Sequence, residues 1–332
     1  MSDFLRHRQV EFRLFVVLLL SCVALGIATD TFLTLGNLTS LLNNNSVNLI
    51  WAVGLLVVLI AGGIDISFAV ASSVVQFVAA KVLVSLGGGN WALGFLLCGC
   101  VGILLGLVNA FFIHRFRIIS IVVTIATFNV FFGLLMWLSR GRSIYALPDW
   151  WTERIILFEH QSPDGTWSEL ILPVAVMALC VGTTWLLVRR VNLGRQLYAF
   201  GDNPEGARRA GVNIAAMQAL AFGWSGLMAG IAALMQVNIV QEVVPNALYG
   251  RELEVLAAVV LGGARLGGGK GTITGCVLGV LFVAVMQNGL NLLGISPFAF
   301  QMLIGAAILV AISTSNVRLG ELLAARPRRH GS

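Results

Sequence analysis

The sequence predicts an all-α fold, a polytopic bundle of transmembrane helices, from its composition and from the length of its apolar runs. Hydrophobic residues make up 58% of the 332 residues and charged residues 11%, with a mean hydropathy of +0.91. Soluble proteins have roughly 45–50% apolar and roughly 25% charged residues, so a soluble fold is excluded. Many apolar runs reach about 20 residues, the length of a helix that crosses a bilayer. We expect residues 1–332 to form a single transmembrane domain.

The predicted spans are apolar runs in which the backbone must satisfy its own hydrogen bonds, and within a bilayer a helix achieves this. Eight runs are long enough to cross: 12–29, 66–86, 91–113, 118–138, 170–188, 215–236, 271–290 and 298–316. Two shorter runs, 47–62 and 254–264, end in glycine. Together they predict about ten spans, of which eight are secure.

The first run follows Arg6, Arg8 and Arg13, so a cleaved signal peptide is an alternative to a retained span. The end of the run, residues 26–30, offers no convincing small-x-small cleavage site. We therefore expect the run to be retained as the first span.

The positions of the basic residues predict the orientation of the chain. Ten spans with a cytoplasmic N-terminus place both termini in the cytoplasm, and cytoplasmic loops of membrane proteins carry an excess of Lys and Arg. The longest inner loop is then 189–213, and the longest outer segment is 139–169. The inner segments hold 16 of the 21 basic residues: Arg6, Arg8, Arg13, Arg115, Arg117, Arg189, Arg190, Arg195, Arg208, Arg209, Arg265, Lys270, Arg318, Arg326, Arg328 and Arg329. The net charge of +6 therefore indicates orientation rather than binding of nucleic acid.

Motifs that would indicate an enzyme are incomplete. Residues 223–226 read GWSG, as in intramembrane serine proteases, but such a protease needs a histidine base beside the serine. The four histidines lie in termini or loops, so we interpret Ser225 as a small-residue contact between helices. Residues 267–272 read GGGKGT, without the glycine spacing or the Ser or Thr after Lys270 that a phosphate loop requires. The chain itself is not expected to catalyse a reaction or to bind ATP.

Metal and ion sites are not indicated either. The five cysteines lie in apolar runs without CxxC spacing or a nearby histidine, so no metal site is expected. An ion-coupled carrier places ionisable groups near the midplane of the membrane. Outside the loops we find Lys81 and Asp65, and Asp65 lies in a glycine break. We expect an uncharged solute and an external source of energy, with an ATP-independent channel or ion-coupled carrier as the competing class.

Residues 202–211, in the inner loop, predict a short helix outside the membrane. An N-cap residue, a proline in the first turn, an acidic residue near the positive end of the helix dipole, basic residues near its other end and a closing glycine follow in order. They are Asn203, Pro204, Glu205, Arg208, Arg209 and Gly211. Such a helix is suited to docking in a groove of a partner. A solvated loop that fixes the topology is the other interpretation, and the residues alone leave both open.

Two glycine-rich segments interrupt the spans. In residues 61–67, Gly62 and Gly63 end one apolar helix and Asp65 can cap the start of the next. Such a break is tolerated at membrane depth where protein or water surrounds it, so a hinge and a tight hairpin are both open. In residues 252–271, a short apolar helix begins with two acids and ends at Gly262 and Gly263, the first of a series of glycines that permit close backbone packing.

These three segments, in this order, resemble the permease subunits of bacterial ABC importers of the ribose type. The chain reads AGGIDISFAVAS at 61–72, LGRQLYAFGDNPEGARRAGV at 193–212 and RELEVLAAVVLGGARLGGGKGTITG at 251–275. The resemblance covers nearly the whole chain. The chain departs from the family's motifs after Ser67, in lacking the usual proline before the fifth span, and at Gly206, where the family has alanine.

The resemblance implies a multi-pass protein of the bacterial inner membrane that imports a monosaccharide (pentose, hexose or deoxyhexose) or the sugar-like autoinducer-2. It implies two cytoplasmic ATPase subunits or one fused ATPase, a second permease (itself or a sister chain) and a periplasmic sugar-binding protein. ATP and Mg²⁺ would lie on the ATPase subunits, with no cofactor in this chain. The implied coupling helix, which docks on the ATPase, contains Asn203, Pro204, Glu205, Ala207, Arg208, Arg209 and Gly211.

A path for an uncharged sugar needs hydrogen-bonding side chains within the spans. Polar residues in the apolar runs are candidates for this path, and each could equally be a contact between helices. The candidates are Asn45, Asn48, Gln76, Asn109, Asn129, Gln287 and Asn288.

Overall fold

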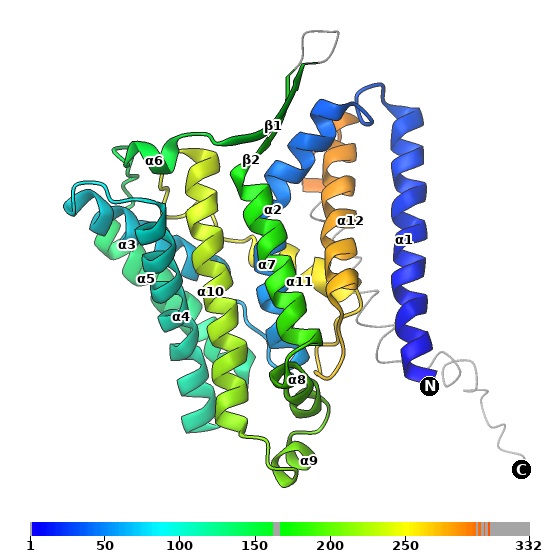
Figure 1. Ribbon diagram of the computed structural model, residues 1–332, viewed down its shortest axis with the longest axis vertical. Helices are drawn as coiled ribbons and strands as arrows, with labels where there is room; N and C mark the ends of the chain where they lie inside the picture. The colour runs from blue at the N-terminus through cyan, green and yellow to red at the C-terminus, as the bar shows by residue number, and fades with distance from the viewer. Residues whose placement is uncertain (1, 162–166, 297, 300–301, 303–304, 306–332) are drawn as a thin grey trace, which may run out of the picture.

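The computed structural model describes residues 2–161, 167–296, 298–299, 302 and 305 (Figure 1). The long helices are α1 (Ser2–Ala28), α2 (Leu35–Ile60), α3 (Phe68–Ser85), α4 (Trp91–Phe116), α5 (Ser120–Ser139), α7 (Leu172–Arg189), α10 (Ile214–Val240) and α12 (Ile273–Leu292). The shorter elements are α6 (Asp149–Thr152), β1 (Ile156–Gln161), β2 (Trp167–Ile171), α8 (Asn192–Asp202), α9 (Pro204–Arg209) and α11 (Glu252–Leu261). Within these described ranges, eight helices are long and apolar enough to cross a membrane.

The long helices confirm most of the predicted spans. Seven of the eight long apolar runs are helical where the sequence predicts them, and the eighth, 298–316, lies almost entirely outside the described residues. The run 47–62 is the second part of a longer helix, α2, whose N-cap residue Thr34 accepts a hydrogen bond from the Asn37 amide at 3.3 Å. The polar residues 43–46 in its first half explain why the apolar run is shorter than the helix.

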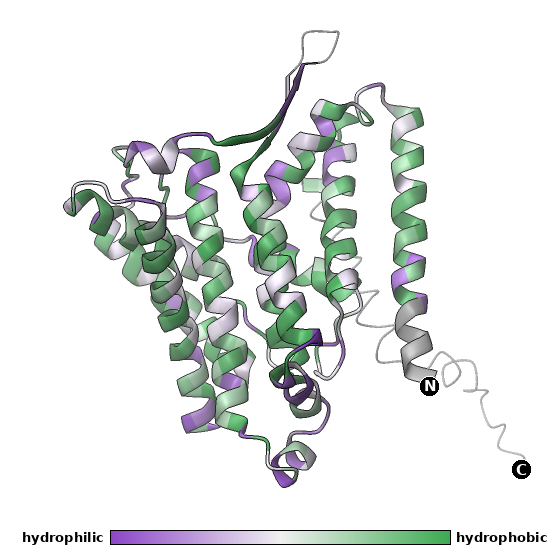
Figure 2. Cartoon of the chain, in the orientation of Figure 1, coloured by the Kyte–Doolittle hydropathy of each residue, from purple (hydrophilic) through white to green (hydrophobic). Residues whose placement is uncertain are grey.

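α2 forms the centre of the bundle, with residues 47–60 buried and with α7, α10, α11 and α12 packed around it. Beside it, α4 and α10 approach each other closely at glycines. A Cβ atom on Gly102 would lie 2.2 Å from the Gly226 carbonyl oxygen, and one on Gly230 would lie 2.1 Å from that of Cys98. Small residues allow helices to pack in this way in membranes. The helices are covered by hydrophobic residues along their length, as Figure 2 shows.

The two ends of the bundle differ. One end carries α8, α9 and the start of α1, and the other carries the hairpin of β1 and β2 (Figure 1); we name them the α9 end and the hairpin end. The two strands pair antiparallel, with Phe158 opposite Leu170. The hairpin adds a small sheet to the predicted all-α fold. It lies in the segment 139–169, for which the sequence predicts no element, and β2 extends two residues past it into the predicted span 170–188.

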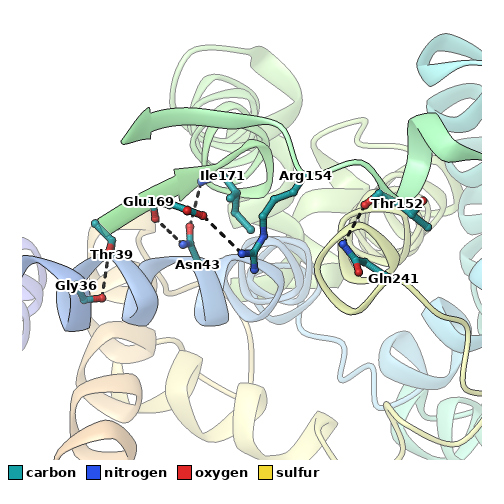
Figure 3. Close-up of polar contacts among 8 residues, drawn as sticks. All are labelled: Gly36, Thr39, Asn43, Thr152, Arg154, Glu169, Ile171 and Gln241. Carbon is teal, nitrogen blue, oxygen red and sulfur yellow. Dashed lines mark hydrogen bonds and ion pairs between the residues drawn. The ribbon is translucent and has the colours of Figure 1, made fainter. Parts of the chain in front are cut away.

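The hairpin is attached to the first half of α2 through Asn43 (Figure 3). The Asn43 amide donates to the Glu169 carbonyl oxygen at 2.8 Å, and its Oδ1 accepts from the Ile171 amide at 3.3 Å. Arg154 and Glu169 form an ion pair at 3.5 Å. Asn43, one of the polar residues that make the apolar run shorter than helix α2, therefore also attaches the hairpin to that helix.

The predicted span 254–264 takes a different form in the structure. α10 ends at the hairpin end and α12 begins at the α9 end, so residues 241–272 connect the two ends (Figure 1). Helix α11 has 10 residues, or about 15 Å at the rise of an α-helix, against about 30 Å for the hydrocarbon core. The helix alone does not cross. Residues 241–251 make the rest of the crossing as non-helical chain, which a hydropathy pattern does not detect.

Candidate functional site

The three segments singled out in the sequence meet at the α9 end, where their backbones touch. Gly62 follows α2, Gly201 lies near the end of α8, and Gly268 and Gly269 belong to the loop before α12. We name these four residues the glycine junction. The Gly269 amide donates to the Ile60 carbonyl oxygen at 2.9 Å.

Glycine is required at the junction for two reasons. A Cβ atom on Gly201 would lie 1.8 Å from the Ile60 carbonyl oxygen, and one on Gly268 would lie 2.6 Å from the Gly62 Cα. In addition, Gly62 and Gly268 have φ angles of +81° and +83°, in the left-handed region that other residues rarely adopt. The end of the central helix is therefore in direct backbone contact with α8.

Helix α9 has the capped form that the sequence predicts. The Asn203 Oδ1 accepts from the Gly206 amide at 2.9 Å, Pro204 is the first helical residue, and Gly211 follows the helix with a φ of +86°. Figure 1 shows α9 extending beyond the ends of the long helices. The helix is thus a separate element outside the bundle.

The charged side chains of α9 are exposed. Glu205 Oε1 accepts from Arg208 Nη2 at 3.1 Å and from Arg209 Nε at 3.2 Å. The hydrogen bond from Arg208, with that from Arg209, holds the pKa of Glu205 below its usual range, so its carboxylate is ionised at neutral pH. Exposed ion pairs contribute little to stability. Both guanidinium groups are therefore accessible to a partner.

Helix α8 connects α9 to the junction and is not among the predicted elements. Its buried residues Gly194, Leu197 and Gly201 follow the spacing of one helix face. That spacing is the signal that could have found it. The Tyr198 hydroxyl donates to the Gly271 carbonyl oxygen at 2.6 Å, which adds a second contact between α8 and the glycine loop.

The break between α2 and α3 contains a buried polar cluster around Asp65. The sequence predicts that Asp65 caps the next helix; Ser67 holds the N-cap position of α3, and the Asp65 Oδ1 accepts from the amide and the hydroxyl of Ser67, each at 2.8 Å. The Asp65 Oδ2 accepts from the Ser225 hydroxyl at 2.9 Å. Ser225 also packs against α2, since a Cβ atom on Gly54 would lie 3.3 Å from the Ser225 Cα, as expected for a small-residue contact between helices. Its hydroxyl in addition links α10 to the break.

The cluster continues into two more helices. The Asn109 amide of α4 donates to the Ser67 hydroxyl at 2.8 Å, and the Thr127 hydroxyl of α5 donates to the Asn109 Oδ1 at 2.6 Å. Asn109, a candidate for the substrate path, thus has both ends of its amide engaged in the bundle. Sequence reasoning missed Thr127 because its partner lies on another helix.

The other path candidates fall into two groups. Asn45, Asn48 and Gln76 lie near residues 241–251: Asn48 donates to Asn45 at 3.2 Å and accepts from Arg251 at 3.0 Å, and Gln76 donates to the Val244 carbonyl oxygen at 3.3 Å. The rest are elsewhere. Asn288 pairs with Asn37, Gln287 is exposed on α12, and Asn129 is exposed on α5.

The glycines at the end of α11 are packed against α12. A Cβ atom on Gly262 would lie 2.2 Å from the Gly275 carbonyl oxygen, and Gly263 has a φ of +93°. These contacts fix the direction in which the chain leaves α11. Gly63, in the α2–α3 break, would place a Cβ atom 3.1 Å from the Phe222 ring, so it too lies at a close contact.

The fold and this site define a class of protein: a multi-pass membrane protein with a short exposed helix that is connected by backbone contacts to the centre of its bundle. The chain belongs to the family described as branched-chain amino acid transport system / permease component, which matches residues 37–312. It is therefore a permease, the transport subunit of an ABC importer, and a multi-pass protein of the bacterial inner membrane. ATPase and substrate-binding partners are general in this family.

The chain is similar to several import permeases over most of its length. It is 30% identical to the ribose import permease protein RbsC of Escherichia coli K12 over 92% of this chain and 94% of that one. It is 30% identical to the autoinducer 2 import system permease protein LsrC of Photorhabdus luminescens, over 89% and 86%. It is 30% identical to the fructose import permease protein FrcC of Rhizobium meliloti, over 90% of this chain and 83% of that one. No solved structure matches the chain.

Proposed function

We propose that this permease imports a monosaccharide, and that ATP hydrolysis on separate subunits drives it through α9. The observation that carries the proposal is the continuous connection from the exposed helix α9, through α8, to the end of the central helix α2 at the glycine junction. A partner that moves α9 would thereby move the centre of the bundle. This is the geometry required for alternating access, in which rigid parts of the bundle rock against each other.

The partners follow from this mechanism. The α9 end faces the cytoplasm, together with both termini, and Asn203, Pro204, Glu205, Ala207, Arg208, Arg209 and Gly211 form the surface that docks on the ATPase. Two ATPase subunits or one fused ATPase bind ATP and Mg²⁺, and this chain binds no cofactor. A second permease, identical or a sister chain, completes the path. A periplasmic sugar-binding protein delivers substrate at the hairpin end.

The substrate class rests on the relatives, whose names specify ribose, fructose and autoinducer-2. A pentose, hexose or deoxyhexose fits a membrane interior with few ionisable groups, because an uncharged sugar needs hydrogen bonds rather than a counter-ion. Autoinducer-2, which is sugar-like, is the alternative within the same family. Gly62, Gly63, Asp65, Gly262 and Gly263 form the turns at the α9 end about which the helices move.

Reconstitution tests the proposal. The substrate is first identified as the sugar, from a panel, that thermally stabilises the binding protein encoded beside the permease. The permease is then placed in liposomes with that binding protein and with the ATPase encoded beside it. We expect uptake that requires ATP, the ATPase and the binding protein together. Equal uptake by the permease alone would instead establish an ATP-independent channel or carrier.

A further inference from the structure

Residues 241–251 run without helical structure at a depth where the neighbouring chain is membrane-spanning helix. Arg251 Nη2 donates to Asn48, and its guanidinium lies 5.4 Å from the centre of the Trp51 ring; both partners are near the middle of α2. Tyr249 lies 5.2 Å from the Phe128 ring and 4.7 Å from the Phe132 ring, near the middle of α5. These contacts place Tyr249 and Arg251, at the end of the non-helical half of the crossing, near the midplane of the bilayer, whereas Val243 pairs with Ile144 toward the hairpin end.

Part of this segment is exposed. Asn246, Ala247, Tyr249 and Gly250 are all accessible on the surface of the chain, and 52% of Tyr249 is exposed. Non-helical backbone at membrane depth is tolerated where it is buried in protein or lines a water-filled cavity, because lipid cannot satisfy its polar groups. The exposed side of residues 241–251 therefore does not face lipid.

The side chains around this segment are those that an uncharged, hydroxyl-rich solute requires. Arg251 offers guanidinium donors, and Tyr249 offers a ring and a hydroxyl. Among the described residues the buried Gln76 Oε1 has no hydrogen-bond partner. Polar groups at this depth are costly unless they face water or protein.

We propose that the exposed side of residues 241–251 lines the water-filled path of the permease and reaches mid-membrane at Tyr249 and Arg251, and that these two side chains contact the sugar as it passes. The proposal rests on the proposed function for the identity of the solute. The position of the path, however, follows from the backbone geometry. Of the predicted path residues, Asn45, Asn48 and Gln76 lie around this segment, whereas Asn109 and Asn288 are engaged in contacts between helices.

Accessibility of an introduced cysteine tests the position of the path. Ala247→Cys is made in the full transporter after replacing the two native cysteines that are not buried, Cys22 and Cys100, with serine. Leu104→Cys, at an exposed position near the middle of α4, is the matched control. The probe is a charged, membrane-impermeant methanethiosulfonate reagent. We expect labelling of Ala247→Cys to be at least about tenfold faster than that of Leu104→Cys, because charged reagents are excluded from hydrocarbon. Equal, slow labelling of both would overturn the proposal, since lipid or a second permease would then cover the segment.

Uptake tests the contact with sugar. For Arg251→Gln we expect the concentration of D-ribose or D-fructose at half-maximal uptake to rise about tenfold, as for loss of a hydrogen bond to a charged group. Arg154→Gln, at the base of the hairpin, should leave it unchanged. If the sugar concentration at half-maximal uptake is unchanged in Arg251→Gln and the variant unfolds at the normal temperature, Arg251 does not contact the sugar.

The two proposals fail separately. If the wild type takes up neither sugar while Ala247→Cys is labelled rapidly, the proposed substrate class is wrong and the position of the path stands. If uptake is driven by ATP while Ala247→Cys is labelled no faster than the control, the position of the path is wrong and the proposed function stands.

Discussion

Gly201 shows how much a single residue constrains the α9 end. The backbone of α8 touches that of α2 because Gly201 has no side chain, and the nearest oxygen, that of Ile60, would lie 1.8 Å from an added Cβ atom. The sequence indicates close packing wherever glycines are dense. It does not indicate that Gly62, Gly201 and Gly268 meet, because they are far apart in the chain and glycine has no side chain whose pattern could pair them.

Gly201→Ala should therefore separate α8 from α2. We expect the free energy of unfolding to fall by about 1–3 kcal/mol, as for overpacking of a close contact, and uptake to fall with it. The measurement is thermal unfolding in detergent with an uptake assay. Gly182→Ala is the control, because a Cβ atom added there, in α7, would meet no neighbouring element of the described chain within 4 Å. Equal stability of the two variants would show that the junction is not tightly packed.

Asp65 carries a second prediction at this scale. Replacing it with leucine leaves the Ser67 amide and the Ser225 hydroxyl buried without their acceptors, and each loss costs about 1–3 kcal/mol. Asparagine has a similar shape and keeps an acceptor for Ser67. Asp65→Leu should therefore unfold at a clearly lower temperature than Asp65→Asn. If the two variants unfold alike, the hydrogen bonds of Asp65 do not stabilise the break.

Among the elements, those with local signals were predictable and those with distant partners were not. The short helix α9 could be predicted because its cap, proline and closing glycine lie within nine residues, 203–211. The first half of α2 was missed because its asparagines lower the hydropathy, and the partner of Asn43, the hairpin, lies more than a hundred residues later. The non-helical half of the crossing before α11 has no periodic pattern at all, so only its contacts reveal it.

The attachment of the hairpin to α2 is expected to depend on Asn43 more than on the ion pair beside it (Figure 3). Asn43→Ala removes two hydrogen bonds to the backbone of β2, and we expect it to lower the free energy of unfolding by about 1–3 kcal/mol. Arg154→Ala breaks an exposed ion pair and should cost less than about 1 kcal/mol. Thermal unfolding of both variants compares them. A larger loss for Arg154→Ala would reverse this assignment.

For the molecule as a whole, we propose that a partner moves α9 and that the contacts at the glycine junction transmit this movement to the central helix α2. The scarcity of charge, 11% of the residues, is consistent with a membrane body that moves an uncharged solute without an ion of its own. The class of protein and its family could be recognised from the sequence. The location of the path could not, because the polar residues of the spans serve both as contacts between helices and as candidates for the path.

The most direct measurement of the central claim is ATP-dependent sugar uptake by the reconstituted transporter carrying Arg208→Glu and Arg209→Glu together. Both side chains are exposed on α9, so the variant should fold, insert and unfold thermally like the wild type. Arg115→Glu with Arg117→Glu, a charge reversal at the same end outside α9, is the control. We expect uptake and association with the ATPase to be lost in the α9 variant and retained in the control. Wild-type uptake and normal ATPase association in the α9 variant would contradict the central claim.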